Sequence, residues 1–259
     1  NKDLLSKCKF MINADMVGAD PAEAGSILTL YRTPYSLPSS LNNVVGYWLE
    51  AEAARKPKPS AGEAPTPHPW NLHHYGAGSD HFMFTDSTIG IPGIMLNQSI
   101  DKFYHTSSDT IDKIDESQMA WASRVIVLSV LSLAHPRFVS KEKLLTLVRN
   151  EGIRIMQRVS VDAVNILGRC LDNPEKVYPR TMRWLGYSKD LGCATLDKTG
   201  EEWYLISEQK ELRDALKASI EMAYATEMVV ARKAYLGACA EVGLEAKDED
   251  HFDLDSFES

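Results

Sequence analysis

The sequence predicts an α/β protein, in which part of a mixed β-sheet with flanking helices is followed by a helical extension. Three observations lead to this prediction. Over residues 1–138, short apolar runs alternate with helical patterns and turn residues. Over residues 139–245, apolar residues recur at helical spacing without strand alternation. Residues 246–259 are rich in Asp and Glu and form a predicted acidic tail.

The first segment begins with two predicted strands, over residues 7–17 and 27–31. A helix over residues 37–55 follows, with Ser39 or Ser40 as its cap and an apolar face that includes Leu41, Val45 and Leu49. Residues 56–70 contain five prolines, which favour an exposed, extended loop. Such a loop either shapes a binding pocket or is a surface excursion, and the sequence leaves both readings open.

Three further elements complete the first segment. We expect a helix over residues 80–87, a compact buried strand over residues 94–96 and a long helix over residues 117–133. Ser79 is placed to cap the first of these helices. The strand is entered through Pro92 and Gly93, and the long helix has an apolar face that would cover the sheet.

The helical extension contains two long patterns, over residues 141–171 and 209–242. We expect Gly152 to interrupt the first pattern, and Glu201 and Glu202 to lie in a polar turn. The extension is predicted to form an antiparallel helix pair that docks on the first segment or on a second subunit.

Composition indicates a globular protein and excludes few functions. The chain is 44% hydrophobic and 25% charged, and its net charge is −8. A negative balance without basic patches argues against nucleic-acid binding. No apolar run approaches the ~18 residues of a membrane span, so we expect none. The sequence does not assign a location: a soluble protein, secreted or periplasmic, is compatible with it. The four cysteines are widely spaced. They are either free thiols or paired in two disulfides.

His105 lies in a polar loop that resembles a metal-ligand loop. It follows Tyr104 and precedes Thr106, Ser107, Ser108 and Asp109, whose side chains bond to their own backbone and make a rigid turn. A neutral imidazole is a common zinc ligand, and Asp109 or Asp112 would set its tautomer. The alternative is an ordinary surface histidine.

Two other polar sites accompany His105. Asp15 is an isolated carboxylate near the end of the apolar run MINADMVG, and the Asp80/His81 pair opens the predicted helix over residues 80–87. All three sites lie where strands meet loops, which in open α/β sheets is where ligands bind. His73 and His74 would point opposite ways in an extended segment, so we do not expect them to share a metal.

With these motifs the chain resembles the two-zinc aminopeptidases, whose relatives include leucyl aminopeptidase, glutamate carboxypeptidase II and glutaminyl cyclase. The matching features are D-M-x-G at a strand end, S-D-H-x-x-F at a helix start, a G-I-P strand entry and Y-H-T followed by D-T-x-D-x-I-D. They cover roughly residues 8 to 135. The resemblance implies a peptide substrate and two zinc ions, with Asp15 as the non-bridging carboxylate of one and His105 on the other. It places Asp80, and with less weight Tyr104 and His81, beside the metals or against the substrate.

The resemblance is incomplete in one respect. In that family the first histidine, the bridging aspartate and a pair of glutamates lie upstream of the D-M-x-G strand, and no other part of this sequence replaces them. We therefore expect the chain to be the C-terminal part of a zinc exopeptidase domain and to contain no catalytic base. The upstream part of the same polypeptide, or a second chain, would complete the site. Alone, these residues should bind zinc weakly and hydrolyse nothing.

Two alternatives remain from the sequence. The first is a non-catalytic protein-interaction module on the same scaffold, and the second is an enzyme with glutaminyl cyclase chemistry.

Overall fold

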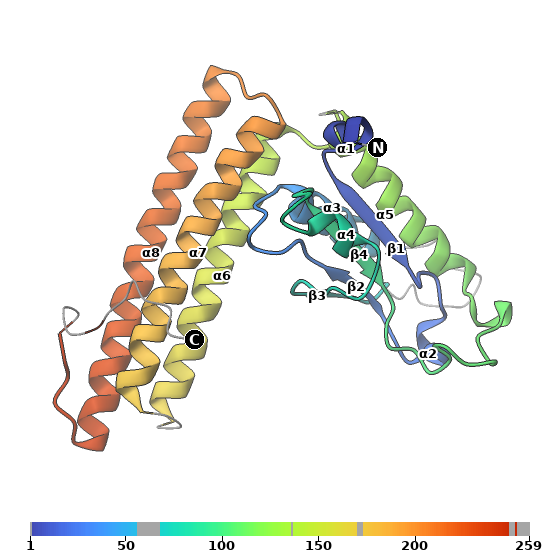
Figure 1. Cartoon of the computed structure of the whole chain (residues 1–259). Coiled ribbons are helices and arrows are strands. Elements are labelled where there is room, and N and C mark those ends of the chain that lie inside the picture. Colours follow the sequence, from blue (N-terminus) through green and yellow to red (C-terminus); the bar gives the residue numbers. More distant parts are fainter. Residues whose placement is uncertain (1, 56–67, 136, 170–172, 249–251, 253–259) are drawn as a thin grey trace. The chain divides into compact units, whose positions relative to one another are not determined.

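The computed structural model describes residues 2–55, 68–135, 137–169, 173–248 and 252. The chain divides into two compact units, Asn1–Ser140 and Lys141–Ser259. The first unit combines a sheet with helices, and the second is helical (Figure 1). The predicted fold class is confirmed: a mixed four-stranded sheet with flanking helices precedes a long helical region.

The sheet has the strand order β1-β4-β2-β3. Its strands are β1 (Met11–Asp15), β2 (Leu28–Tyr31), β3 (Trp70–His73) and β4 (Gly93–Asn97). Strand β1 is parallel to β4, β4 is antiparallel to β2, and β2 is parallel to β3. The sequence did not predict β3, because the prolines before Trp70 obscure a strand of only four residues.

Helices cover both faces of β4, all five residues of which are buried. Ile94 and Leu96 point to one face, where they join a core built with α3 (Leu41–Ala53) and α5 (Glu116–Ala134). Gly93 points to the other face, where α4 (His81–Thr85) packs so closely that a Cβ on Gly93 would lie 3.2 Å from the Thr85 Cγ2.

Polar contacts also join α3 to α5. The buried Glu52 accepts a hydrogen bond of 2.8 Å from the Arg124 Nε, and the Trp48 Nε1 donates one of 2.8 Å to the Ser132 Oγ. Helix α5 is the one helix of the described residues that is long and apolar enough to span a membrane. Its inner face, with Trp121 and Val125, is buried in the core, so we interpret it as a core helix of this unit.

Three short helices complete the first unit: α1 (Lys2–Lys7), α2 (Pro21–Ala24) and the 3₁₀ helix η1 (Ile111–Lys113). Because α1 occupies residues 2–7, the first strand begins at Met11 rather than at the predicted residue 7. Helix α4 ends at Thr85, two residues before the predicted end, because Asp86 has an extended ψ of 140°. The proline-rich segment from 56 to 67 lies outside the described residues.

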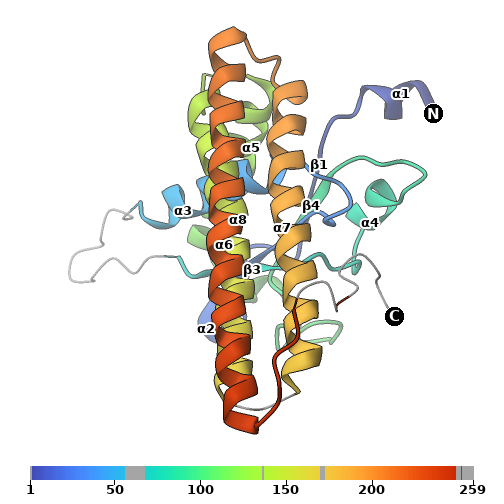
Figure 2. The same cartoon turned by 90° about the vertical axis from the view of Figure 1, so that its left-hand side faces the viewer.

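The second unit is a bundle of α6 (Lys141–Gly168), α7 (Pro174–Glu202) and α8 (Ser207–Val242), which run side by side (Figures 1 and 2). Three long helices replace the predicted pair. Glu201 and Glu202 end α7 instead of forming a turn. Gly152 lies inside α6 and does not interrupt it. There α6 approaches α7 so closely that a Cβ on Gly152 would lie 3.3 Å from the Gly192 Cα.

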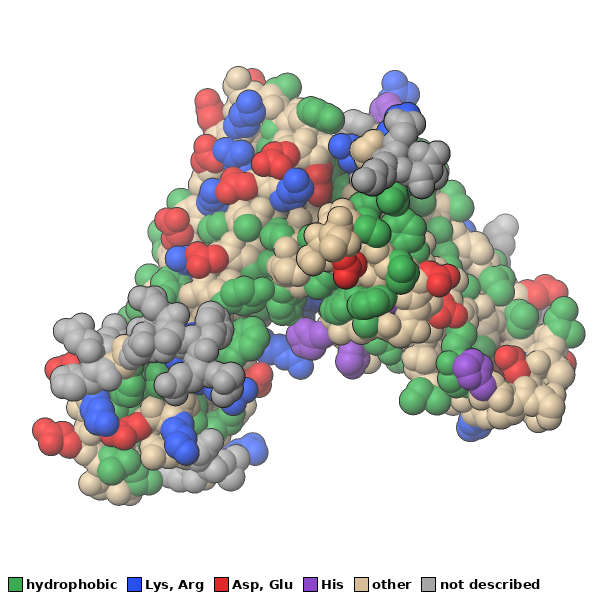
Figure 3. Space-filling model, viewed as in Figure 1, with side chains coloured by type: hydrophobic (Ala, Val, Ile, Leu, Met, Phe, Trp, Pro, Cys, Tyr) green, Lys and Arg blue, Asp and Glu red, His purple; other side chains and the backbone are tan. Residues whose placement is uncertain are grey.

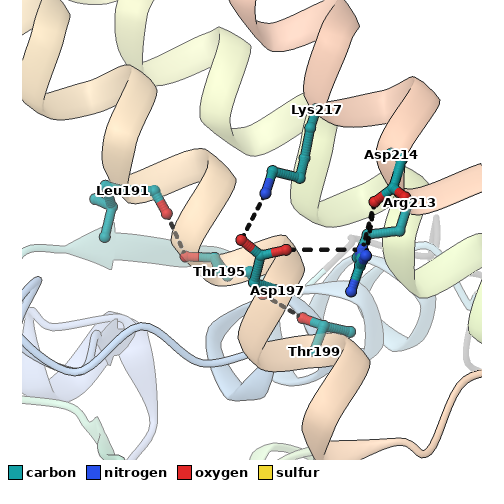
Figure 4. A network of polar contacts seen from close by, with 7 residues as sticks. All are labelled: Leu191, Thr195, Asp197, Thr199, Arg213, Asp214 and Lys217. Atoms are coloured by element: carbon teal, nitrogen blue, oxygen red, sulfur yellow. Dashed lines mark hydrogen bonds and ion pairs between the residues drawn. The ribbon is translucent and has the colours of Figure 1, made fainter. Parts of the chain in front are cut away.

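An ion-pair network links α7 to α8 (Figure 4). Asp197 accepts a hydrogen bond of 2.6 Å from the Lys217 Nζ, and its other oxygen lies 3.7 Å from the Arg213 Nε. Arg213 also pairs with Asp214. Over the described residues of the face in Figure 3, basic and acidic side chains are interspersed on this unit. The side chains of this ion-pair network are partly exposed, so each pair contributes at most about 1 kcal/mol to stability.

Part of the predicted acidic tail packs against the bundle. The backbone amide of Lys247 donates a hydrogen bond of 3.1 Å to the Tyr235 hydroxyl, and Arg232 donates one of 2.7 Å to the Lys247 carbonyl. Phe252 contacts the stacked rings of Tyr178 and Tyr235 edge-on. The remaining tail residues, from 249 to 251 and from 253 to 259, lie outside the described part of the chain.

Candidate functional site

Asp15 is the last residue of β1, at the carboxyl end of the strand. It lies in register with Asn97, the last residue of the parallel strand β4, so both side chains belong to the same edge of the sheet. Asp15 is half-buried, and none of the described residues donates a hydrogen bond to its carboxylate or forms an ion pair with it. The carboxylate oxygens are therefore available to a ligand.

The backbone turns sharply directly after Asp15. Met16 has a φ of +55°, in the left-handed region that non-glycine residues seldom occupy. Its carbonyl accepts a hydrogen bond of 3.1 Å from the backbone amide of Gln98. Such strain persists only where surrounding contacts hold it, and it is concentrated at functional sites.

His105 lies in an exposed turn and is also left-handed, with a φ of +57°. Its ring stacks on Tyr104, with 3.8 Å between the ring centroids, and no described residue forms a hydrogen bond with either ring nitrogen. The predicted polar turn follows: the Thr106 Oγ1 donates to the Phe103 carbonyl at 2.7 Å and accepts from the Ser108 amide at 3.2 Å. Local hydrogen bonds hold the turn, and the described residues leave both ring nitrogens of His105 without a hydrogen bond.

Backbone hydrogen bonds join the segment after Asp15 to the segment after His105. The Asp115 amide donates to the Gly18 carbonyl at 3.0 Å, and the Asp20 amide donates to the Lys113 carbonyl at 2.9 Å. Between these two bonds Ala19 and Ile114 form an antiparallel bridge. Residues 18–20, which follow Asp15, are thus paired with residues 113–115, which lie eight or more positions after His105, although ninety positions separate Asp15 from His105 in the sequence.

Asp80 and His81 lie beside β1. Asp80 is exposed, while His81 is fully buried, and its Nε2 donates a hydrogen bond of 2.7 Å to the Gly76 carbonyl. Burial lowers the pKa of His81. The Gly76 hydrogen bond and the nearby charges of Asp15 and Asp80 act in the opposite direction. A neutral His81 therefore anchors the start of α4 near Asp15.

Two contacts differ from the sequence expectations. Ser79 does not cap α4; its hydroxyl accepts a hydrogen bond of 2.7 Å from the Asn13 side chain of β1. Asp112 does not orient His105. Its carboxylate pairs with the Lys113 Nζ at 2.8 Å, and hydrogen bonding to Lys113 is the main cause that lowers the pKa of Asp112 to about 2.

The donor types at Asp15 and His105 fit zinc, which binds carboxylate oxygen and imidazole nitrogen. The described residues contain no group of three or more His, Cys, Asp or Glu side chains arranged to hold a metal ion. The two residues thus fit as part of a ligand set and do not form a complete one.

Sequence reasoning missed Gln98, which is 1% exposed and makes side-chain hydrogen bonds to the segment after Asp15. A signal for it was present: Asn97 and Gln98 are polar residues at the end of the apolar run GIML. Polar side chains that directly follow a buried strand must find partners, and Gln98 finds them across the sheet edge.

Comparison with known proteins assigns the family. A family model described as peptidase family M28 matches residues 1–130, which is half of the chain. No curated protein and no solved structure matches the chain. M28 is a family of metallopeptidases that typically bind two zinc ions. The family match covers the sheet and both candidate ligands, and the chain belongs to peptidase family M28.

Proposed function

We propose that this chain is the C-terminal part of a zinc-dependent aminopeptidase that removes N-terminal residues from peptides. Asp15 serves as the non-bridging carboxylate ligand of one zinc, and His105 as the imidazole ligand of the other. The remaining ligands and the general base come from residues outside this sequence. The observation that carries the proposal is that Asp15 and His105, two unpartnered donors of the right chemistry, each precede one of two segments that pair with each other.

The outer edge of β1 supports the proposal that further residues complete the site. Strand β1 is an outer strand, and its residues are at least partly exposed, in contrast to those of its fully buried neighbour β4. Apolar residues such as Met11 and Ile12 would be better buried if another strand paired with β1. Additional strands along this edge would bring new side chains toward Asp15.

Each candidate site residue has a defined role in this proposal. Zinc, when bound, supplies the Lewis-acid chemistry that polarises the scissile carbonyl. Asp15 and His105 hold the two ions, and the buried His81 anchors α4 beside Asp15 through the Gly76 carbonyl. Tyr104 stacks on the His105 ring and restricts its rotation, and its exposed edge is available to a peptide side chain. Asp80 precedes His81 at the start of α4 and is exposed, so its carboxylate is available to a substrate group.

An assay with aminoacyl-p-nitroanilides tests the proposal. The full-length polypeptide should hydrolyse them, and a chelator should abolish turnover. Asp15→Asn and His105→Gln should each remove most of the activity. His135→Gln, at the far end of α5, is the matched control and should retain it.

Two results would contradict the proposal. Chelator-sensitive turnover by these 259 residues alone, at the rate of the full-length protein, would mean that the ligand assignment is wrong. Zinc-independent binding of a protein partner, without turnover by the full-length polypeptide, would favour the non-catalytic interaction module.

A further inference from the structure

The side chain of Gln98 connects the end of β4 to the segment that follows β1. Its Oε1 accepts hydrogen bonds from the Gly18 amide at 2.6 Å and from the Ala19 amide at 3.0 Å. Its Nε2 donates a hydrogen bond of 3.1 Å to the Ala19 carbonyl. Gln98 is 1% exposed, and 80 positions separate it from Gly18 in the sequence. The side-chain amide is thus a buried, long-range link with almost all of its hydrogen-bonding capacity in use.

The backbone of Gln98 reinforces this link. Its amide donates to the carbonyl of Met16, the left-handed residue directly after Asp15. Gln98 therefore holds the chain at Met16 on one side of Val17, and at Gly18 and Ala19 on the other. Since no described side chain bonds to the Asp15 carboxylate, its position depends on the backbone of β1 and of the turn that follows.

The same segment pairs with Ile114 and Asp115, which follow the loop that contains His105. Gly18 accepts from the Asp115 amide, and Ala19 forms the bridge with Ile114. Gln98 thus stands at the junction of three segments: the end of β4, the turn after Asp15 and the strand-like segment after His105.

We propose that Gln98 is a positioning residue, which holds Asp15 and the His105 segment in the relative arrangement that zinc binding requires. The inference rests on the proposed function of Asp15 and His105. A metal site needs its donors held in place before the ion binds. Residues that orient the ligands through hydrogen bonds contribute about 10- to 100-fold to metal affinity. Gln98 contacts neither donor, so it acts through the backbone.

Two substitutions of Gln98 separate the roles of its atoms. Gln98→Met keeps the length of the side chain and removes every side-chain hydrogen bond, while the backbone bond to Met16 stays. Gln98→Glu keeps an acceptor for the Gly18 and Ala19 amides and loses only the donor to the Ala19 carbonyl. Asn42→Leu is the matched control, because Asn42 is also a side-chain amide that fastens a loop of this unit, through Thr33, away from Asp15.

Two measurements apply to each variant. Zinc affinity of the full-length polypeptide is measured by competition with a chromophoric chelator. Amide hydrogen exchange at Gly18 and Ala19 is measured by NMR on the metal-free 259-residue chain. We expect Gln98→Met to bind zinc about 10- to 100-fold more weakly and to exchange faster at these two amides. Gln98→Glu should bind zinc more tightly than Gln98→Met, and Asn42→Leu should bind like the wild type.

The outcomes distinguish this inference from the proposed function. Faster exchange at Gly18 and Ala19 with unchanged zinc affinity would overturn the positioning role and leave the proposed function intact. Equal losses in Gln98→Met and Asn42→Leu would mean general destabilisation and would also overturn it. Should Gln98→Met fail to fold, Gln98→Glu decides. If Gln98→Glu and Asn42→Leu bind zinc equally, and both bind it more weakly than the wild type, the inference is contradicted. Unchanged zinc affinity in Asp15→Asn removes the proposed function and this inference together.

Discussion

The amide of Asp115 donates a hydrogen bond of 3.0 Å to the carbonyl of Gly18. Asp115 is also the N-cap of α5, where its carboxylate accepts from the Gln118 amide at 2.7 Å. The turn that follows Asp15 is therefore anchored to the first turn of a core helix. This contact connects the half-buried end of β1 to the helix that packs on the sheet.

We predict that substituting the candidate ligands leaves the fold intact. Asp15 is half-buried and His105 is exposed, and neither belongs to the hydrophobic core. In the metal-free chain, Asp15→Asn and His105→Gln should each change the free energy of unfolding by less than about 1 kcal/mol. Urea unfolding followed by circular dichroism measures this. A loss of several kcal/mol would mean that these residues are structural.

The neighbours Leu196 and Asp197 should differ widely in their contribution to stability. Leu196 is fully buried in the bundle, so Leu196→Ala should cost about 2–5 kcal/mol. Asp197 pairs with partly exposed cations, so Asp197→Ala should cost less than about 1 kcal/mol and still less at high salt. Urea unfolding at two salt concentrations tests both, and a larger cost for Asp197→Ala would contradict the packing described for α7.

Substitutions at two glycines of the bundle should have opposite effects on its stability. Gly152→Ile should destabilise the bundle by about 1–3 kcal/mol or more, because the new side chain meets the Gly192 backbone. Gly237→Ala, at an exposed position in α8 with no neighbour within 4 Å, should stabilise it by about 0.8–1 kcal/mol. Thermal unfolding ranks the two variants, and a neutral Gly152→Ile would rule out the tight crossing.

His68 should make stability fall in mild acid. It stacks on Trp121 with 4.9 Å between ring centroids, and burial, with a smaller effect of Arg124, lowers its pKa below the ordinary value of 6.5. As the pH falls through 6.5, the unfolded chain takes up a proton that the folded chain does not, so the free energy of unfolding decreases until the folded pKa is reached.

His68→Phe keeps a stacked ring and removes the titration. Its free energy of unfolding should match the wild type at pH 8 to within about 1 kcal/mol and depend less on pH below 6.5. His81, whose pKa burial also lowers, leaves a residual dependence in both proteins. Identical pH slopes in the two proteins would contradict the burial of His68.

The sequence predicted α5 and the buried strand β4 well, because their signals are local. The helical pattern at residues 117–133 and the apolar run around Ile94 both became elements within one residue of the expected ends. The polar turn after His105 was also predictable from Thr106 and Ser108. These features depend on periodicity and on short-range hydrogen bonds.

Other features depend on contacts distant in sequence and were not predicted. A glycine within a helical pattern suggests a break, yet Gly152 lies inside α6. Its missing side chain leaves room for the backbone of Gly192 in α7. The link from Gln98 to Gly18 and the pairing of Ala19 with Ile114 join segments about 80 to 95 positions apart. The assignment of Asp15 and His105 as zinc ligands came from resemblance to a family, and it remains a prediction.

Anomalous X-ray scattering at the zinc edge, from crystals of the full-length polypeptide grown with zinc, tests that assignment most directly. We expect two peaks ~3.5–4 Å apart, one about 2.0–2.2 Å from an Asp15 carboxylate oxygen and the other about 2.0–2.1 Å from a His105 ring nitrogen. Zinc peaks that contact neither residue would contradict the account.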